Sequence, residues 1–306
     1  MLEARAGEQA ERLAEELRGR RPGLLESHPV ETYLAAFAET DRRFGYRAVP
    51  ASARESARAI EAGHGEEALH QYNRLALCTA ASRFGERCRD GGIPEEVEEL
   101  TRPFLTDVLA AAESRSGGRY RMEVDRFAKE FAVARLKMVV GGPELIDLRS
   151  AIPRRSLVHP PRSRIPARLL FVFRRAGGLA PFLESHLDRR LVRAFSRTGY
   201  DAFYRRLALI LEARADLRGY VGPGAWYCDP ALASISPEPG YLAEVPAPNG
   251  AGHFPVPATD VSTRDALRLS PARLAAYEAG KYVPRPHMVV WPRESLIAWA
   301  ADGRAG

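Results

Sequence analysis

The chain has 306 residues, of which 45% are hydrophobic and 27% are charged, and its formal net charge is +6. This composition is that of an ordinary globular protein and excludes disordered and fibrous classes. The length suits one large domain or two domains of ordinary size. The three cysteines lack Cys-x-x-Cys spacing, which excludes the common disulfide frameworks and indicates a reducing compartment. No apolar run approaches the ~20 residues of a spanning helix, so we expect a cytoplasmic protein with no membrane partner.

The positive charge is carried almost entirely by arginine, as GC-rich coding produces. Lysine occurs only at Lys129, Lys137 and Lys281, so 42 of the 45 basic residues are arginines. These arginines are scattered among aspartates and glutamates along the chain. Because a nucleic-acid surface gathers its basic residues on one face or arm, we expect no nucleic-acid partner.

Helix after helix is predicted from Leu2 to about Ala112, because apolar residues recur there at helical spacing between proline and glycine breaks. A long predicted helix after Gly65 carries the apolar stripe Leu69, Tyr72, Ala76 and Ala80. A further helix is predicted over residues 122–138. The breaks that delimit these helices are Pro29, Gly45, Pro50, Gly63, Gly65, Gly91, Gly92, Pro94, Gly141 and Gly142.

The middle of the chain changes character. Four prolines between Pro153 and Pro166 predict an irregular, arginine-rich connection. Residues 169–173 then form a short apolar run that suits a buried strand or the start of a helix. Two helices are predicted next, over 181–195 and 201–214.

After Gly219 a high density of proline and glycine predicts turns and short strands. The pair Ser270-Pro271 predicts a helix start, residues 287–291 predict a strand, and Pro292 opens a last helix. We therefore expect a mainly α fold, with a helical, bundle-like N-terminal and central part and a short-strand, Pro/Gly-rich C-terminal portion. Its two regions are 1–150 and 151–306, packed together as one globular unit.

The common catalytic motifs are missing from the sequence. There is no G-x-G-x-x-G after a predicted strand, no G-x-x-x-x-G-K-[ST], no G-x-S-x-G and no H-E-x-x-H. Glu61-x-x-His64 and Glu67-x-x-His70 have the spacing of helical di-iron ligands, but glutamate is frequent enough for chance matches. The seven histidines are therefore the natural candidates for metal or acid–base chemistry.

Most of the histidines have simple structural interpretations. His28 precedes a proline at a helix start and is interpreted as a cap or surface residue. His159 and His287 lie beside prolines and are interpreted as packing or turn residues. His253 lies in the Gly-rich segment 249–254, which either approaches a ligand or forms a plain turn.

His186 is the strongest candidate for a metal ligand. On the predicted helix 181–195 it has Phe182, Leu183 and Leu187 as apolar neighbours. Arginines at the rim of such an apolar wall pair the carboxylates of a flat hydrophobic cofactor, and haem fits that description. The predicted rim residues are Arg189, Arg190 and Arg193. The alternative is a core or interface histidine whose second nitrogen is satisfied by Glu184 or Asp188.

His70 is the best candidate for a distal, proton-transferring partner of His186. It lies at the edge of the apolar stripe, next to Tyr72, Asn73 and Arg74. The alternative interpretation is a residue on a solvated helix flank.

The Pro181–Tyr200 region, the helical start and the overall size resemble the histidine-ligated haem enzymes that oxidise free amino acids in natural-product biosynthesis. The similar families are the haem-dependent tyrosine hydroxylases and the haem-dependent amino-acid N-oxygenases. The resemblance implies non-covalent haem b with His186 as axial ligand, His70 in the distal pocket, and dioxygen or hydrogen peroxide as oxidant. The His-x-x-x-Cys spacing of one subgroup is absent because residue 190 is Arg190, so a covalent haem link is not expected.

The function expected from this resemblance is hydroxylation or N-oxygenation of a small amino acid such as tyrosine or lysine by a cytoplasmic monooxygenase or peroxygenase, with a homodimer as the expected assembly. Parts of the C-terminal third, such as segments 225–232 and 280–284, are similar to the C-terminal domains of GNAT-like N-acyltransferases. The pyrophosphate loop of those enzymes is absent. A metal-free N-acyltransferase and a non-catalytic interaction protein are therefore the alternatives.

Overall fold

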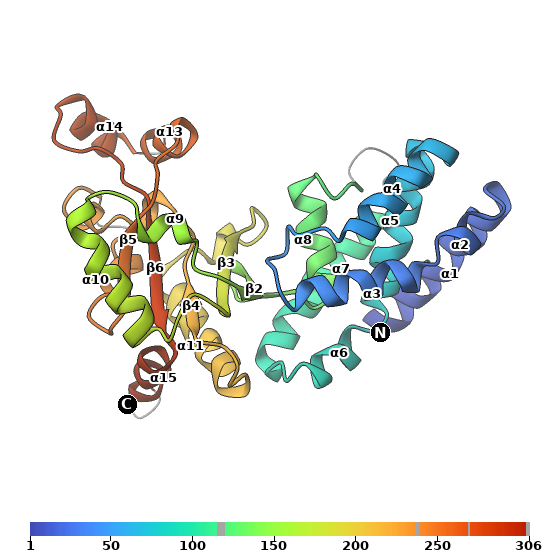
Figure 1. The fold of residues 1–306 in the computed structure, drawn as a ribbon, viewed down its shortest axis with the longest axis horizontal. Coiled ribbons are helices and arrows are strands. Elements are labelled where there is room, and N and C mark those ends of the chain that lie inside the picture. The colour runs from blue at the N-terminus through green and yellow to red at the C-terminus, as the bar shows by residue number, and fades with distance from the viewer. Residues whose placement is uncertain (115–119, 237–238, 269, 304–306) are drawn as a thin grey trace. The chain divides into compact units, whose positions relative to one another are not determined.

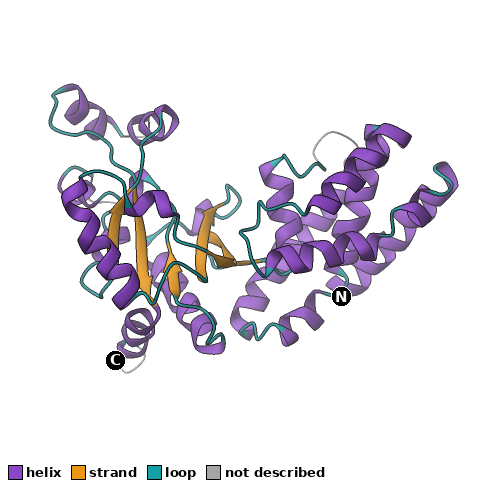
Figure 2. Ribbon diagram, in the orientation of Figure 1, coloured by secondary structure: helices purple, strands orange, loops and turns teal. Residues whose placement is uncertain are grey.

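The computed structural model describes residues 1–114, 120–236, 239–268 and 270–303. The chain divides into two compact units, the first with residues 1–140 and 147–149, the second with residues 141–146 and 150–306. Most described residues lie in helices, so the predicted mainly α fold is confirmed (Figure 2). The expected packing of the two regions as one globular unit stays a prediction. None of the described helices combines the length and the apolar character needed to cross a membrane.

The first unit is built around helix α5, which contacts five other helices of the unit, α1, α3, α4, α7 and α8 (Figure 1). The predicted stripe Leu69, Tyr72, Ala76 and Ala80 is buried, and so are most other residues of α5. The elements of this unit are α1 (Leu2–Arg20), α2 (Leu24–Ser27), α3 (Val30–Asp41), α4 (Ala51–His64), α5 (Glu66–Ala81), α6 (Phe84–Asp90), α7 (Glu95–Ser114), α8 (Asp125–Ala134) and β1 (Met138–Val140).

The core of the first unit is rich in aromatic rings. Phe131 is fully buried, and its ring stacks on Phe127 at 5.8 Å and meets Phe37 edge-on at 5.2 Å. Tyr33 packs edge-on against both Phe37 and Tyr72. Aromatic pairs of this kind add to the free energy gained from burying their area, so this cluster joins α3, α5 and α8.

The helix predicted over 122–138 is too long. Helix α8 ends at Ala134, Leu136 has a left-handed backbone with a φ of 59°, and β1 begins at Met138. A left-handed residue ends an α-helix. The buried Lys137 then pairs with Asp147 of β2 (Glu144–Ser150), with 2.7 Å between Nζ and Oδ1. Neither strand was predicted, because short buried apolar runs carry no periodicity that distinguishes strand from helix.

The second unit has a mixed sheet between helices. Its elements after β2 are α9 (Arg154–Leu157), α10 (Ile165–Leu170), β3 (Phe182–Leu187), α11 (Arg197–Ala213), β4 (Gly219–Val221), α12 (Tyr241–Glu244), β5 (Gly252–Pro255), α13 (Asp260–Arg268), α14 (Pro271–Glu278), β6 (His287–Pro292) and α15 (Arg293–Asp302). The strand order within the unit includes β3-β4-β6-β5. Strands β3 and β4 are parallel, and β6 is antiparallel to both β4 and β5.

Alternate residues of these strands face opposite sides of the sheet, as strand geometry requires. On one side Val221, Met288 and Val290 form a core with the segment 152–176. On the other side Trp291 meets Tyr204 of α11 and Trp299 of α15, at ring distances of 5.3 and 5.4 Å. The sheet is therefore covered by helices on both faces.

The C-terminal predictions hold better than the central ones. The predicted helix over 201–214, the helix from Pro271, the strand over 287–291 and the last helix after Pro292 are confirmed as α11, α14, β6 and α15. The run 169–173 adopts its helical alternative, because α10 continues into one wide helical turn over Phe171–Arg175. Gly219 begins β4 with a φ of 148°, and a Cβ there would lie 2.2 Å from the carbonyl oxygen of Trp291, so no side chain fits.

Replacing Phe131 by alanine tests the aromatic core of the first unit. Loss of a fully buried phenylalanine leaves a cavity, and we expect the free energy of unfolding of that unit to fall by about 3–5 kcal/mol. Denaturant unfolding followed by far-UV circular dichroism measures the change. The matched control is Phe44→Ala, because the Phe44 side chain is 57% exposed and its loss should change stability by less than about 0.5 kcal/mol. Equal effects of the two substitutions would contradict the assignment.

Candidate functional site

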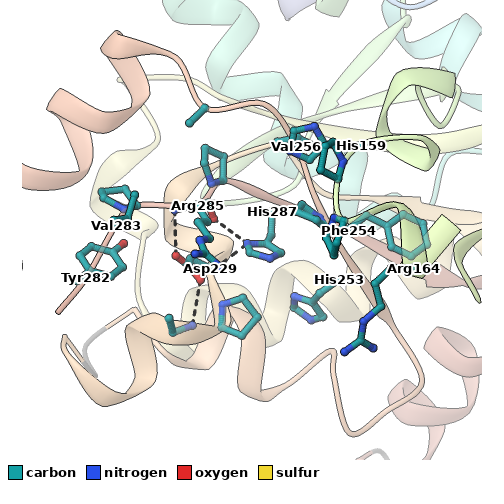
Figure 3. A pocket seen from close by; sticks show the side chains of 18 of the residues that line it. His159, Arg164, Asp229, His253, Phe254, Val256, Tyr282, Val283, Arg285 and His287 are labelled. Atoms are coloured by element: carbon teal, nitrogen blue, oxygen red, sulfur yellow. Dashed lines mark hydrogen bonds and ion pairs between the residues drawn. The ribbon is translucent and has the colours of Figure 1, made fainter. Parts of the chain in front are cut away.

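A large open pocket lies within the second unit (Figure 3). Its volume of about 1260 Å³ is ample for a small organic molecule. Four stretches of chain line it: 159–171 around α10, 229–235, 252–258 with β5, and 280–287 leading into β6. Three of the seven histidines, His159, His253 and His287, lie among the lining residues.

Asp229 ties two walls of the pocket together. Its Oδ1 accepts the backbone N–H of Ala231 at 3.0 Å, and its Oδ2 accepts the backbone N–H of Arg285 at 3.1 Å. The same carboxylate lies 3.8 Å from Nδ1 of His287. Asp229 is only 4% exposed, so these hydrogen bonds are shielded from water and hold the two segments in one arrangement.

A second buried carboxylate fixes the turn that precedes Asp229. The Oε1 of Glu144 accepts hydrogen bonds from the hydroxyls of Tyr200 at 3.0 Å and Tyr227 at 3.1 Å. Burial is the main cause that raises the pKa of both phenols well above the ordinary value, and the negative charge of Glu144 is the second cause. Both phenols therefore stay protonated and donate. Tyr227 belongs to a 3₁₀ turn over Trp226–Cys228, and its bond to Glu144 therefore anchors the chain just before Asp229.

His287 has a defined tautomer. Its Nδ1 lies 2.7 Å from the carbonyl oxygen of Arg285, and since a carbonyl oxygen only accepts, Nδ1 carries the proton and donates. In the neutral ring Nε2 is then the basic nitrogen. Burial lowers the pKa of His287 below its ordinary value of 6.5, and the positive charges of Arg285 and Arg168 act in the same direction. The Arg285 carbonyl and Asp229 oppose the shift.

His253 lies near His287 in the same pocket, on β5 next to β6 (Figure 3). Both of its ring nitrogens are shielded from solvent. Among the described residues, neither nitrogen has a hydrogen-bond partner at ordinary length and angle. Burial lowers the pKa of His253, and the nearby His287 lowers it further, while the backbone of Cys228 favours the protonated form. Two neighbouring imidazoles are therefore held in the neutral form near pH 7.

The charge of the lining favours an anionic ligand. Among the described residues that line the pocket, Asp229 is the only one with a carboxylate. This carboxylate accepts hydrogen bonds from two backbone N–H groups. The cationic side chains of the lining are Arg164, Arg168, Lys281 and Arg285. Burial is the main cause that lowers the pKa of Arg168, and the positive charge of Arg164 is the second cause. A lowered pKa is expected where cationic side chains lie close together without carboxylates to pair with them.

His186 is not on a helix. Residues 182–187 form strand β3, so the predicted helix over 181–195 is wrong. The segment pairs with β4, where Leu183 lies opposite Tyr220 and Glu184 opposite Val221. This pairing with a strand more than thirty residues away in the chain overrides the local helical spacing of the leucines. His186 is not among the residues that line the pocket.

The contacts of His186 and of the three predicted rim arginines are as follows. Its Nε2 lies 3.7 Å from Oε2 of Glu184, which is the partner foreseen in the alternative interpretation. Arg190 is bound by Asp188 through its Nε at 2.9 Å and its Nη2 at 2.8 Å. Arg189 and Arg193 are exposed. The helical wall expected around His186 is not formed, because residues 182–187 are a strand, and the haem-binding role of His186, Arg189, Arg190 and Arg193 stays a prediction.

His70 lies on α5 in the first unit, whereas His186 belongs to the second. Its side chain is buried, with Nε2 3.5 Å from Oε1 of Glu66. The expectation of a residue on a solvated helix flank is therefore wrong. The proposed role of His70 as a distal partner of His186 stays a prediction.

The sequence interpretation missed Asp229 and His287 as site residues. His287 was interpreted as a packing or turn residue, and Asp229 carried no motif. The one usable signal was the glycine-rich approach to His253, because Gly252 places its backbone against the ring of Phe171 at the pocket wall. The remaining lining residues come from segments whose proximity no local pattern indicates.

No family model matches the sequence, and neither a curated protein nor a solved structure matches it. The assignment of the candidate site therefore rests on the chemistry and geometry of its own residues. The resemblance to haem enzymes also stays a prediction, because these comparisons do not bear on it.

Acidification should destabilise the second unit through His253 and His287. Their pKa values in the folded chain lie below 6.5, so below that pH the unfolded chain binds more protons, and the free energy of unfolding falls as pH is lowered. Denaturant unfolding between neutral pH and about pH 5 measures the slope. The double variant His253→Asn/His287→Asn should lose less stability on acidification than the parent. The control His28→Asn/His64→Asn, in the first unit, should keep the parental slope; an unchanged slope in the pocket variant contradicts the assignment.

Proposed function

We propose that the second unit is an enzyme module that binds an anionic small organic molecule and removes a proton from it with His287. The single observation that carries this proposal is the fixed tautomer of His287, whose Nδ1 is held by the Arg285 carbonyl at 2.7 Å. That arrangement leaves the basic Nε2 in a large, positively charged pocket. A neutral imidazole near pH 7 is the side chain best suited to general base catalysis.

Each group in the pocket has a role in this proposal. Arg164 and Lys281 attract and hold the anionic group of the substrate. His287 takes the substrate proton on Nε2, and the electron pair of the broken bond stays on the substrate. Asp229 lies 3.8 Å from Nδ1 and favours the imidazolium that forms. His253 stays neutral beside it, so that it adds no competing charge.

The test is a comparison of metabolite turnover by the full chain and by His287→Gln. Both proteins are incubated with a mixture of phosphorylated and carboxylated metabolites, and consumption is followed by mass spectrometry. We expect the parent chain to consume at least one anionic compound and the variant to do so about 10²–10⁴-fold more slowly, the usual contribution of a general base. The control His64→Gln should retain full activity. Equal turnover by parent and His287→Gln overturns the role of His287, and no turnover by the parent overturns the enzyme proposal.

The same screen bears on the N-acyltransferase alternative. Acyl-CoA is a polyanion, and a pocket whose lining carries more cations than carboxylates suits its phosphates. Including acyl-CoA with amine acceptors in the mixture therefore separates acyl transfer from simple proton abstraction. Acyl transfer would appear as an acylated product and free CoA.

Haem-dependent oxidation of a small amino acid is a separate proposal, supported by the resemblance and by the chemistry of His186. The imidazole of His186 is 20% exposed and the exposed Arg189 and Arg193 follow it in the chain. If it is the axial ligand, protein purified from haem-supplied cells shows a Soret band that His186→Ala loses and the control His64→Ala keeps. A colourless parent protein excludes this function.

A further inference from the structure

An exposed apolar face runs along α10 and the helical turn that follows it. Pro166, Leu169, Leu170 and Phe173 stand at positions i, i+3, i+4 and i+7, so they share one side of the helix. Leu170 is 62% exposed and Phe173 is 57% exposed. These four residues are called the α10 face below.

The opposite side of the same helix already supplies the contact with the unit's core. Arg168, Val172 and Ala176 are buried there, and Val172 and Ala176 pack with the sheet residues Val221 and Val290. The α10 face is therefore not needed to hold the helix on the sheet. Single exposed apolar side chains are common, but an exposed stripe at helical spacing indicates a binding surface.

The charge around this face is of one sign. From Leu148 to Leu183 the sequence contains eight arginines and neither aspartate nor glutamate, so this segment departs from the even mixing of charges expected for the whole chain. Exposed arginines lie at both ends of the α10 face: Arg162, Arg164, Arg174 and Arg175. Within the described part of the chain, none of these four forms an ion pair with a carboxylate.

We propose that the α10 face docks on the surface of a membrane that contains anionic lipid. Leucine and phenylalanine side chains enter the boundary between headgroups and acyl chains, and the flanking arginines pair lipid phosphates. The anionic headgroups of a bilayer can pair with arginines at any position on its surface, so the α10 face needs no partner of matching shape. The complementary charge and the helical apolar stripe together favour lipid over a second copy of this chain, which would bring the same positive charges into contact.

This proposal does not depend on the proposed function. It revises the expectation of no membrane partner, which came from the lack of a spanning segment, because docking on a surface requires no such segment. Arg164 and Phe171 line the pocket from the same helical stretch. Docking through the α10 face would therefore bring that wall of the pocket close to the lipid.

The test is co-sedimentation of the full chain with vesicles of phosphatidylcholine alone or mixed with phosphatidylglycerol. We expect binding to the mixed vesicles, little binding to phosphatidylcholine alone, and weaker binding at high salt. The variant Leu170→Glu/Phe173→Glu should bind mixed vesicles at least about tenfold more weakly, since it removes the apolar contact and adds like charge to the lipid. The variant Arg174→Gln should bind about fivefold more weakly, the effect of one basic residue near such a surface.

The matched control is Val261→Glu/Tyr277→Glu, which replaces two exposed apolar residues on α13 and α14 of the same unit and adds the same charge. It should bind nearly as the parent does, and circular dichroism of each variant establishes that it is folded. Absence of binding to the mixed vesicles overturns the proposal, as does equal loss in the control. A parent chain that is dimeric, binds no vesicles and becomes monomeric with Leu170→Glu/Phe173→Glu would assign the face to a second copy instead.

Discussion

The hydrogen bonds of Asp229 are the constraint on which the pocket of the second unit depends. One carboxylate accepts the backbone N–H groups of Ala231 and Arg285, which lie far apart in the sequence. Because the chain next enters β6 at His287, the same bonds set where the imidazole stands. Glu144 extends this constraint through Tyr227, so the turn before Asp229 is also fixed from within the core. Two buried carboxylates thus determine where the basic nitrogen of the site is presented.

This arrangement explains how a region dense in proline and glycine supports a defined site. Such segments form few regular backbone hydrogen bonds, and their conformation depends on side chains that satisfy the free backbone N–H and carbonyl groups. Asp229 and Asn249 do this here, Asn249 by donating from its amide to the carbonyl of Val245 at 2.7 Å. Trp291 Nε1 in turn donates to the Asn249 carbonyl at 3.0 Å, which links the turn to the sheet.

The helices of the first unit could be predicted from sequence because their signals are local. Proline, glycine and the spacing of residues such as Leu69 and Tyr72 suffice to place them. Strand β3 could not be predicted, since the leucines of 183–191 match a helical period and the pairing with β4 is decided by tertiary contacts. The same ambiguity extended the helix before Met138 too far. Periodicity identifies long amphipathic helices reliably and short buried strands poorly.

The candidate site was harder to predict than the fold. His186 attracted attention because its neighbours in sequence are apolar and basic, but on a strand those neighbours point in alternate directions. His287 and Asp229 have plain sequence surroundings, and what distinguishes them is burial, a fixed tautomer and a shared pocket. The interpretation that histidines are the natural candidates for the chemistry stays a prediction. The choice among the seven histidines required knowledge of which chain segments meet.

The scarcity of lysine gives the pocket a chemical property of its own. Lys137 is buried against Asp147, and Lys129 is held by Asp125 at 2.7 Å with little of its side chain exposed. Lys281 is the one exposed lysine side chain among the described residues, and it stands in the pocket lining. Covalent acylation of lysine side chains in the native chain is therefore directed to the pocket. The extent of acylation at Lys281 reports whether the pocket is occupied.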